Sequence, residues 1–420
     1  MLTATTALAQ VPRDTLYLDE LQRAAEQADP RGIQLGLLSR QSASRLETLR
    51  RERLPAVGVT GTAQYVSDVV SVGALMPSLT VPAPPHDQYD LYLTVRQPLI
   101  DPTRAGRAAV ERAGEAESAA RVRTALWQQR VAVNEAFFGA LLRSSQLSSL
   151  DAAIGDLDAR LTMARTRVSA GAALPSEALL LETELLRRRQ ARDEIVSERN
   201  AAREVLGLLT GRSIVSTVVL ASRVAAGGAS AGTTDTPGRD RPEFAQFDRA
   251  RATLDARRAA TSAQDLPRLS VFGRTGYGRP GLNALNRAFD AYFLAGLQVE
   301  WSPWTWGRTR RELEVQALQA ELIGADERAF RDALRRAGVT QRAQIGALAG
   351  GLAADDSIVA LRAQILRETR VRHDEGEVSA ADYIARLTEH LSAQLDRDAR
   401  RVRLEEARAR YLTTMGLEVR

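Results

Sequence analysis

The chain has 420 residues, no cysteine, and three histidines at positions 86, 373 and 390. The lack of cysteine excludes disulfides, thiolate metal sites and a catalytic thiol, and histidines this far apart in sequence suggest neither a metal site nor a catalytic triad. The formal net charge is +5, but arginines alternate with acidic residues, which is typical of solvated, salt-bridged helix faces rather than of nucleic-acid binding. We therefore predict no catalytic, metal or cofactor-binding residues.

The N-terminal segment Leu2–Gln10 ends in Ala7-Leu8-Ala9. Small residues at the first and third of these positions resemble the cleavage end of a secretory signal, although a charged start and most of the apolar middle are missing. We interpret residues 1–10 as the remnant of a signal peptide, with a flexible N-terminus as the alternative. The sequence contains no run of about 18 apolar residues, so we predict no membrane-spanning helix.

Residues 14–211 are predicted to form the first of two tandem structural repeats. Apolar and polar residues alternate at about 56–65 and 89–97, which predicts two strands with one apolar face each. No proline occurs from Thr103 to about Ala170, and at 1.5 Å per residue this predicts a helix of about 100 Å. The chain is then predicted to turn near Gly171 and to return as a second helix. Apolar residues in alternating steps of four and three predict a coiled-coil seam: Leu150, Ile154, Leu157, Leu161, Ala164 and Val168.

Residues 212–241 are predicted to be an equatorial segment and a linker rich in Gly, Ala, Ser and Thr. Within it, Gly228–Gly232 spells G-x-S-x-G, the sequence of a nucleophile elbow. That motif requires a strand before it, a helix after it, and histidine and acid partners. A low-complexity linker predicts neither element, so we do not interpret Ser230 as a nucleophile.

Residues 242–420 are predicted to repeat the first plan, with strands at about 268–277 and 291–301 and a turn near Gly376. Several matched positions are separated by 205 residues, including Pro98 with Pro303 and Gly171 with Gly376. A constant offset over this length indicates an internal duplication.

The sequence Gly276–Gly281 fits the dinucleotide-binding pattern G-x-G-x-x-G. In that fingerprint the glycines open a helix within a β-α-β unit. Here they are followed by another alternating segment, so we predict a β-hairpin whose loop runs from Arg279 to Asp290, and no phosphate-binding loop.

The predicted strands have the 9–11 residues that a tilted strand needs to cross a bilayer, and aromatic residues lie at both ends, as in a membrane barrel. The alternative is a soluble sheet with tryptophans in its core. Four strands cannot close a barrel, and open edges are not tolerated in lipid. Membrane strands would therefore require several chains. Two chains would supply eight strands, whose interior is nearly filled by side chains, whereas three would supply twelve strands and leave a lumen. We predict three chains. The aromatic residues are Tyr65, Tyr89 and Tyr277 at one level and Trp301, Trp304 and Trp306 at the other.

Several passages, in order along the chain, resemble the TolC-type family of outer membrane efflux proteins. They are LYLDELQRAAEQADP (16–30), RRERLPAVGVTGTAQY (50–65), VRQPLID (95–101), VEWSPWTWGR (299–308), and the two glycine turns followed by Glu177 and Asp382. The resemblance implies a mainly α chain with a β membrane segment, each repeat giving a two-strand hairpin and a long antiparallel coiled-coil hairpin. It also implies a homotrimer with a 12-stranded barrel in the outer membrane of a Gram-negative-type bacterium and an α-helical tube in the periplasm.

The function that the resemblance implies is an exit duct without enzymatic activity. Such a duct conducts substrate passively from an inner-membrane pump or ABC-type secretion transporter, joined through a periplasmic adaptor (membrane fusion) protein, in tripartite efflux or type I secretion. The alternative is a soluble coiled-coil scaffold. The resemblance makes Asp382 a pore gate, while the family's second acid is replaced by Ala385; the alternative role of Asp382 is to favour the start of a helix. The turns expected to contact the adaptor are Gly171, Ala172, Ala173, Gly376, Glu377 and Val378.

Overall fold

The computed structural model describes residues 15–69, 83–216, 218–222, 241–283 and 286–418. The predicted signal remnant and the Gly228–Gly232 sequence lie outside these residues. The chain divides into two compact units. We call Met1–Gln34, Arg121–Phe244 and Glu327–Arg420 the tip unit, and Leu35–Ala120 with Ala245–Asp326 the sheet unit. Each unit therefore takes residues from both predicted repeats.

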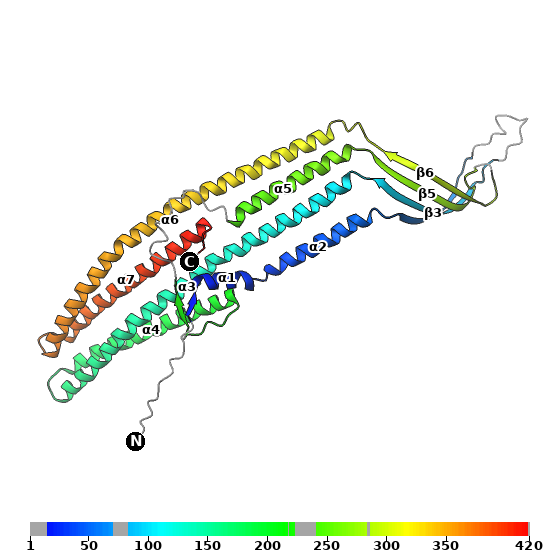
Figure 1. The fold of residues 1–420 in the computed structure, drawn as a ribbon. Coiled ribbons are helices and arrows are strands. Elements are labelled where there is room, and N and C mark those ends of the chain that lie inside the picture. The colour runs from blue at the N-terminus through cyan, green and yellow to red at the C-terminus, as the bar shows by residue number, and fades with distance from the viewer. Residues whose placement is uncertain (1–14, 70–82, 217, 223–240, 284–285, 419–420) are drawn as a thin grey trace, which may run out of the picture. The chain divides into compact units, whose positions relative to one another are not determined.

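Two pairs of helices of equal length dominate the fold (Figure 1). Helices α3 (Thr103–Ser169) and α6 (Arg308–Asp374) each have 67 residues, and their starts are 205 residues apart. Helices α4 (Pro175–Thr210) and α7 (Ala380–Met415) each have 36 residues and are also 205 residues apart. The offset seen in the sequence thus recurs in the helix bounds. The other helices are α1 (Leu18–Ala28), α2 (Gly32–Arg51) and α5 (Pro242–Ser262).

The sheet unit contains four strands in the order β2-β3-β5-β6, and all neighbouring strands are antiparallel. Strand β3 extends beyond the predicted 89–97 because the chain passes Pro98 at a β-bulge between Pro98 and Ile100, where proline needs no ladder hydrogen bond. The central pairing of β3 with β5 joins the two predicted repeats. The strands are β2 (Ala56–Tyr65), β3 (Asp87–Ile100), β5 (Arg268–Arg279) and β6 (Asp290–Glu300).

One face of this sheet is apolar and exposed. The register places the odd-numbered residues of β2, β3 and β6 on this face. Val59 and Phe293 are each 71% exposed, and Leu297 is 67% exposed. Among the described residues, no helix makes more than marginal contact with the four strands. In a water-soluble domain such a face would be buried against a core. Its exposure therefore indicates that something apolar outside the chain covers this face.

The opposite face explains the glycines of the G-x-G-x-x-G sequence. Gly276 lies between Tyr92 and Tyr292 in the register. A Cβ atom at Gly276 would lie 2.6 Å from Cζ of Tyr292 and 2.8 Å from Cβ of Tyr92. Only glycine fits at position 276, because the side chains of Tyr92 and Tyr292 leave no room for a Cβ atom. The prediction of a β-hairpin in place of a phosphate-binding loop is confirmed.

Gly276→Ala is expected to destabilise the folded protein by about 1–3 kcal/mol, because the added methyl group overpacks against Tyr92, whose Cβ is fixed to the backbone. The thermal midpoint of the purified protein in detergent measures this effect. Gly273→Ala on the same strand is the matched control, since nothing lies within 4 Å of a Cβ there. Equal midpoints for the two variants would contradict the close approach.

The core of the tip unit lies where α1, α3, α4 and α7 meet beside a two-stranded parallel sheet of β1 (Thr15–Tyr17) and β4 (Val219–Ala221). A second cluster follows the coiled coil of α3, α4 and α7. The predicted seam is confirmed along most of its length: Leu150, Leu157, Leu161 and Ala164 are buried and Ile154 packs against them. Within the described residues, no helix has both the length and the apolar character needed to span a bilayer.

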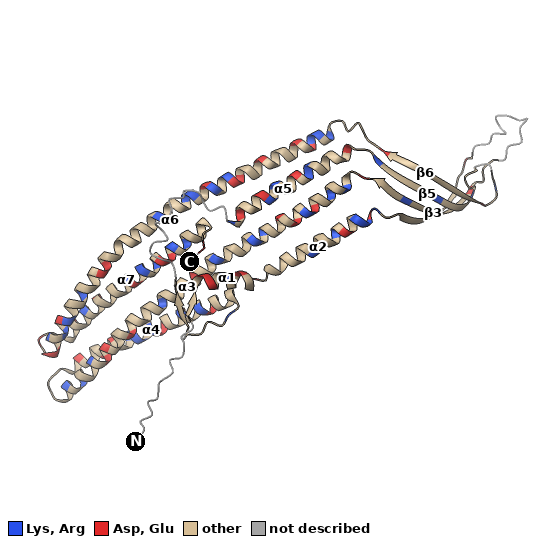
Figure 2. Cartoon of the chain, in the orientation of Figure 1, with Lys and Arg blue, Asp and Glu red and all other residues tan. Residues whose placement is uncertain are grey.

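The charged faces of the helices are paired, as predicted. Figure 2 shows arginines and acidic residues interspersed along the helices. Arg192 on α4 donates to Asp151 on α3 at 2.7 Å, and Arg189 donates to Asp158 at 3.1 Å. These exposed pairs stabilise the helical hairpin only modestly, but they leave little uncompensated charge on this face.

Candidate functional site

The two helical turns at the tips have the same backbone geometry. Gly171 and Gly376 have φ angles of 71° and 80°, which are readily adopted only by glycine. In each turn the next residue closes a Schellman motif: Ala172 N–H donates to Arg167 O at 2.8 Å, and Glu377 N–H to Arg372 O at 2.9 Å. Gly171, Ala172, Gly376 and Glu377 are exposed, whereas Ala173 and Val378 are half-buried.

Asp382 lies in the first turn of α7 and takes part in its N-terminal cap. Its backbone N–H donates to Ser379 Oγ at 3.1 Å, and Ser379 Oγ–H donates to its carboxylate at 2.6 Å. The side chain is exposed. The interpretation that Asp382 favours the start of the helix is therefore confirmed, and its carboxylate still lies at the exposed tip.

A polar network near the tips joins the two helical hairpins, and no motif in the sequence predicts it. Tyr383 Oη on α7 donates to Asp156 on α3, and Arg160 on α3 forms an ion pair with Asp374 at the end of α6. Asp156 also lies 3.5 Å from Arg370. The guanidinium of Arg160 lies 5.5 Å from the centroid of the Tyr383 ring. These contacts hold three helices of both hairpins together.

The centre of the network, Arg160 and Tyr383, is desolvated. The Arg160 side chain is 2% exposed and Tyr383 is fully buried. Burial, followed by the hydrogen bond to Asp156, raises the pKa of Tyr383, so its hydroxyl remains a donor at neutral pH. Arg167 Nη1 donates to the carbonyl of His373 at 3.3 Å. A sequence search for catalytic motifs misses such a network, because its members become neighbours only through tertiary packing.

His373 is expected to make the tips less stable in acid. Its ring stacks on Tyr383 at 5.3 Å. Burial, together with Arg160 and Arg167, lowers its pKa below the ordinary value of 6.5, while Glu177 opposes this. The unfolded segment therefore binds a proton more readily than the folded one. The contribution of His373 to the free energy of unfolding is complete above pH 6.5 and is lost as the pH falls through its lowered pKa.

Hydrogen exchange of the peptides around residues 370–385, corrected for intrinsic rates, measures this effect. Opening should become up to about tenfold more frequent per pH unit below 6.5. Asp374 Oδ1 lies 3.9 Å from His373 Nδ1 but is engaged by Arg160, so it does not reverse the direction. In His373→Gln the extra acid sensitivity should disappear; if it persists, another group is responsible.

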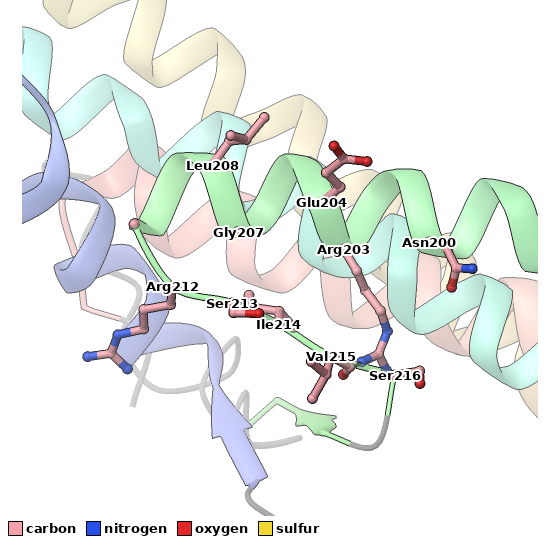
Figure 3. A pocket seen from close by; sticks show the side chains of 11 residues that line it. Asn200, Arg203, Glu204, Gly207, Leu208, Arg212, Ser213, Ile214, Val215 and Ser216 are labelled. Carbon is pink, nitrogen blue, oxygen red and sulfur yellow. Dashed lines mark hydrogen bonds between the residues drawn. The ribbon is translucent and has the colours of Figure 1, made fainter.

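An open pocket of about 700 Å³ lies beside the end of α4, and Figure 3 shows the side chains that line it. Arg203 reaches from α4 across it and donates to Val215 O at 2.7 Å and Val218 O at 3.1 Å. Burial, then Arg199, lowers the pKa of this guanidinium. These hydrogen bonds hold the segment after α4 against the helix. In the described residues, no three potential ligands among His, Cys, Asp and Glu are grouped to hold a metal ion.

The predicted aromatic residues lie at the two ends of the sheet. Tyr65, Tyr89 and Tyr277 are at the loop end, and the rings of Tyr89 and Tyr277 stack with Phe289 at 6.1 and 5.5 Å. Phe289 was missed because it lies in the predicted loop, outside the alternating pattern. At the helix end, the three tryptophans are strongly exposed: Trp301 at 58%, Trp304 at 74% and Trp306 at 90%.

The polar face of the sheet carries a charged and aromatic cluster. Arg274 lies 3.5 Å from the centroid of Tyr92 and forms an ion pair with Asp90. Tyr292 Oη donates to Asp90 at 2.7 Å. The sheet thus has one face suited to lipid and one suited to water, the division found in a membrane barrel strand.

Solved structures of outer membrane channels have the same fold. VceC from Vibrio cholerae matches with a TM-score of 0.66 and 14% identity, covering 96% of this chain and 97% of that chain. The CmeC channel of Campylobacter jejuni matches at 0.66 and 12%, covering 95% and 85%. The open state of the MtrE channel of Neisseria gonorrhoeae matches at 0.65 and 17%, covering 97% and 90%.

These matches confirm the fold that the sequence resemblance implied: a mainly helical chain with a smaller sheet, as in TolC-type channels. No family model matches the chain, and no curated protein matches it.

Proposed function

We propose that the chain is an outer membrane efflux channel, the exit duct of a tripartite efflux or type I secretion system. The observation that carries this proposal is the exposed apolar face of the four-stranded sheet, which no helix of the described residues covers. Because the edge strands β2 and β6 carry unpaired backbone groups, the sheet can enter a bilayer only by pairing with further copies of the chain. Three copies supply twelve strands, enough to enclose a lumen lined by the polar faces.

In this assembly the sheet lies in the outer membrane and the coiled-coil hairpins extend into the periplasm. The tip turns at Gly171–Ala173 and Gly376–Val378 contact a periplasmic adaptor, which connects the channel to an inner-membrane pump or secretion transporter. The channel conducts passively, and the partner supplies the energy. The solved channels of the same fold support this role, and the chain's own contribution is a passage with a gate at the tips.

Conductance across a planar lipid bilayer tests the proposal. The purified oligomer should insert and give discrete, ion-conducting steps, because the lumen of a twelve-stranded barrel is wide enough for water. A protein that is extracted from membranes yet never conducts would contradict the duct.

Asp382→Asn is expected to raise the open probability or conductance, because three copies of the carboxylate form a negative ring at the tip. Ser379→Ala is the matched control: it removes the cap hydroxyl but keeps the charge. It should weaken the first turn of α7 by about 1 kcal/mol and leave conductance unchanged. Equal conductance changes in both variants would mean that Asp382 acts only through the cap.

A further inference from the structure

A pocket of about 480 Å³ lies between α2 and the start of α3, at the helix end of the sheet. Its lining combines four arginines with small and apolar residues and contains no acidic side chain. The lining residues are Leu46, Leu49, Arg50, Arg53, Arg104, Ala105, Ala108 and Arg112. Such a concentration of one charge sign is unusual in a chain whose other charges are so evenly paired, and it points to an anionic occupant.

The arginines of the pocket are incompletely paired. In the described part of the chain, no carboxylate lies within ion-pair distance of Arg53 or Arg112, and Nε of Arg104 is buried without a hydrogen-bond partner. The nearest acid to Arg104 is Asp101 at 3.8 Å, which already accepts a bond of 2.7 Å from Thr103. Nη2 of Arg104 also donates to the carbonyl of Glu52 at 3.4 Å, so the donor groups left for a ligand are chiefly those of Arg53 and Arg112.

Asp101 is also held as a carboxylate by its neighbours. Burial would raise its pKa, but the hydrogen bonds from Thr103 and the charges of Arg107 and Arg104 lower it overall. Its charge is shared with Arg107, which lies 3.2 Å away. Arg50 in turn lies 3.7 Å from Glu47, so Asp101 and Glu47 offset Arg104 and Arg50 but leave the charges of Arg53 and Arg112 uncompensated.

The corresponding place in the second repeat lacks the arginines found at positions 53 and 104. Aligning Leu54-Pro55 with Leu266-Pro267, both directly before a strand, matches Arg53 with Asp265, and the 205-residue offset of the long helices matches Arg104 with Thr309. Thr309 Oγ1 donates to Asp265 Oδ1 at 2.7 Å. In the second repeat these two positions form a hydrogen bond with each other, whereas in the first repeat both are arginines.

The position of the pocket identifies the occupant. At this end of the sheet, β2 begins at Ala56 and β5 at Arg268, while β3 ends at Ile100 and β6 at Glu300. The exposed tryptophans follow Glu300. Exposed tryptophans beside an apolar sheet face mark the headgroup level of a bilayer. Arginine suits phosphate because its planar fork donates two parallel hydrogen bonds.

We propose that this pocket binds the phosphate of an anionic phospholipid from the inner leaflet of the outer membrane. The arginines at positions 53, 104 and 112 hold the headgroup, and Leu46 and Leu49 contact the glycerol and the upper acyl chain. The proposal rests on the proposed function, because it requires the sheet to lie in the membrane. The lipid site would occur once per chain, since only the first repeat carries these arginines.

Native mass spectrometry of the detergent-extracted protein, titrated with phosphatidylglycerol or phosphatidylcholine, tests the site. Arg53→Gln with Arg112→Gln removes two exposed charges of the pocket. Arg257→Gln with Arg258→Gln removes two charges from α5 in the same unit and is the matched control. Wild type and control should bind phosphatidylglycerol alike, and the pocket variant about tenfold more weakly. Phosphatidylcholine should bind weakly to all three.

Equal phosphatidylglycerol binding by the wild type and the pocket variant would overturn the proposal, as would an equal loss of phosphatidylglycerol binding in both double variants. Displacement of the lipid by millimolar inorganic phosphate would also overturn it, because the ligand would then be the free anion. If the proposed function is wrong, the wild-type protein would be absent from the membrane fraction. A membrane oligomer without lipid preference would refute only the proposal that the pocket binds an anionic lipid.

Discussion

Leu297→Arg should prevent the recovery of an assembled oligomer from membranes. Leu297 lies within β6 on the apolar face and is 67% exposed, with Val271 as its cross-strand neighbour. In the proposed barrel this side chain faces lipid, where an arginine near the bilayer midplane costs about 2–4 kcal/mol. Threefold symmetry repeats that cost in every copy, so the loss of assembled protein should be nearly complete.

Gln298→Arg is the matched control for this prediction. Gln298 is the next residue on the same strand and faces the other side of the sheet, where Ser270 is its neighbour. That face already carries Arg96 and Arg274, so an added arginine should be tolerated. The oligomer yield of the two variants, measured by native gel after detergent extraction, distinguishes the faces. Normal yield for Leu297→Arg would mean that this face does not meet lipid.

Asp374→Asn is expected to loosen the tips and increase leakage through the proposed channel. The substitution leaves Arg160, with its 2% exposed side chain, without the opposite charge of Asp374. Removing one partner of a buried ion pair costs about 3–5 kcal/mol, and we expect the lower end because Asp374 is itself 42% exposed. About 3 kcal/mol corresponds to roughly a hundredfold more frequent local opening of the tip.

Hydrogen exchange of the tip peptides and single-channel conductance measure the two consequences. Glu375→Gln, one residue away in the exposed turn, removes the same charge without touching Arg160. It should leave both measurements near wild type. If both variants change exchange equally, the effect comes from the overall charge of the turn, and the buried pair has no special role.

Most of the fold was predictable because its elements carry strong periodic signals. The long helices lack proline, and the coiled-coil seam from Leu150 to Ala164 repeats in steps of four and three. Strand β2 was predicted at its observed bounds because Pro55 precedes it and the alternation is regular. Strand β3 was predicted too short, since Pro98 is normally a strand terminator and only the tertiary structure reveals the bulge that accommodates it.

The contacts that connect distant residues could not be predicted in the same way. The pair of Tyr383 with Asp156 spans 227 positions, and nothing local to either residue marks it. The pocket around Arg53 and Arg104 likewise forms only when α2 packs beside α3. By contrast, the glycines at 171 and 376 carry a local signal, because both must adopt a positive φ to end their helices.

A soluble coiled-coil scaffold explains the helices but not the sheet. The tip unit could serve such a role, since its buried clusters follow the helical hairpins. The sheet unit could not, because Val59, Phe293 and Leu297 would expose a continuous apolar face to water and promote aggregation. A membrane environment removes this conflict and also accounts for the exposed tryptophans.

The native mass of the protein after detergent extraction from membranes shows whether several chains share one barrel. We expect a species near three times the mass of the chain, found in the membrane fraction and absent from the soluble fraction. A monomer or dimer recovered from the soluble fraction would contradict the shared barrel, and with it the export function.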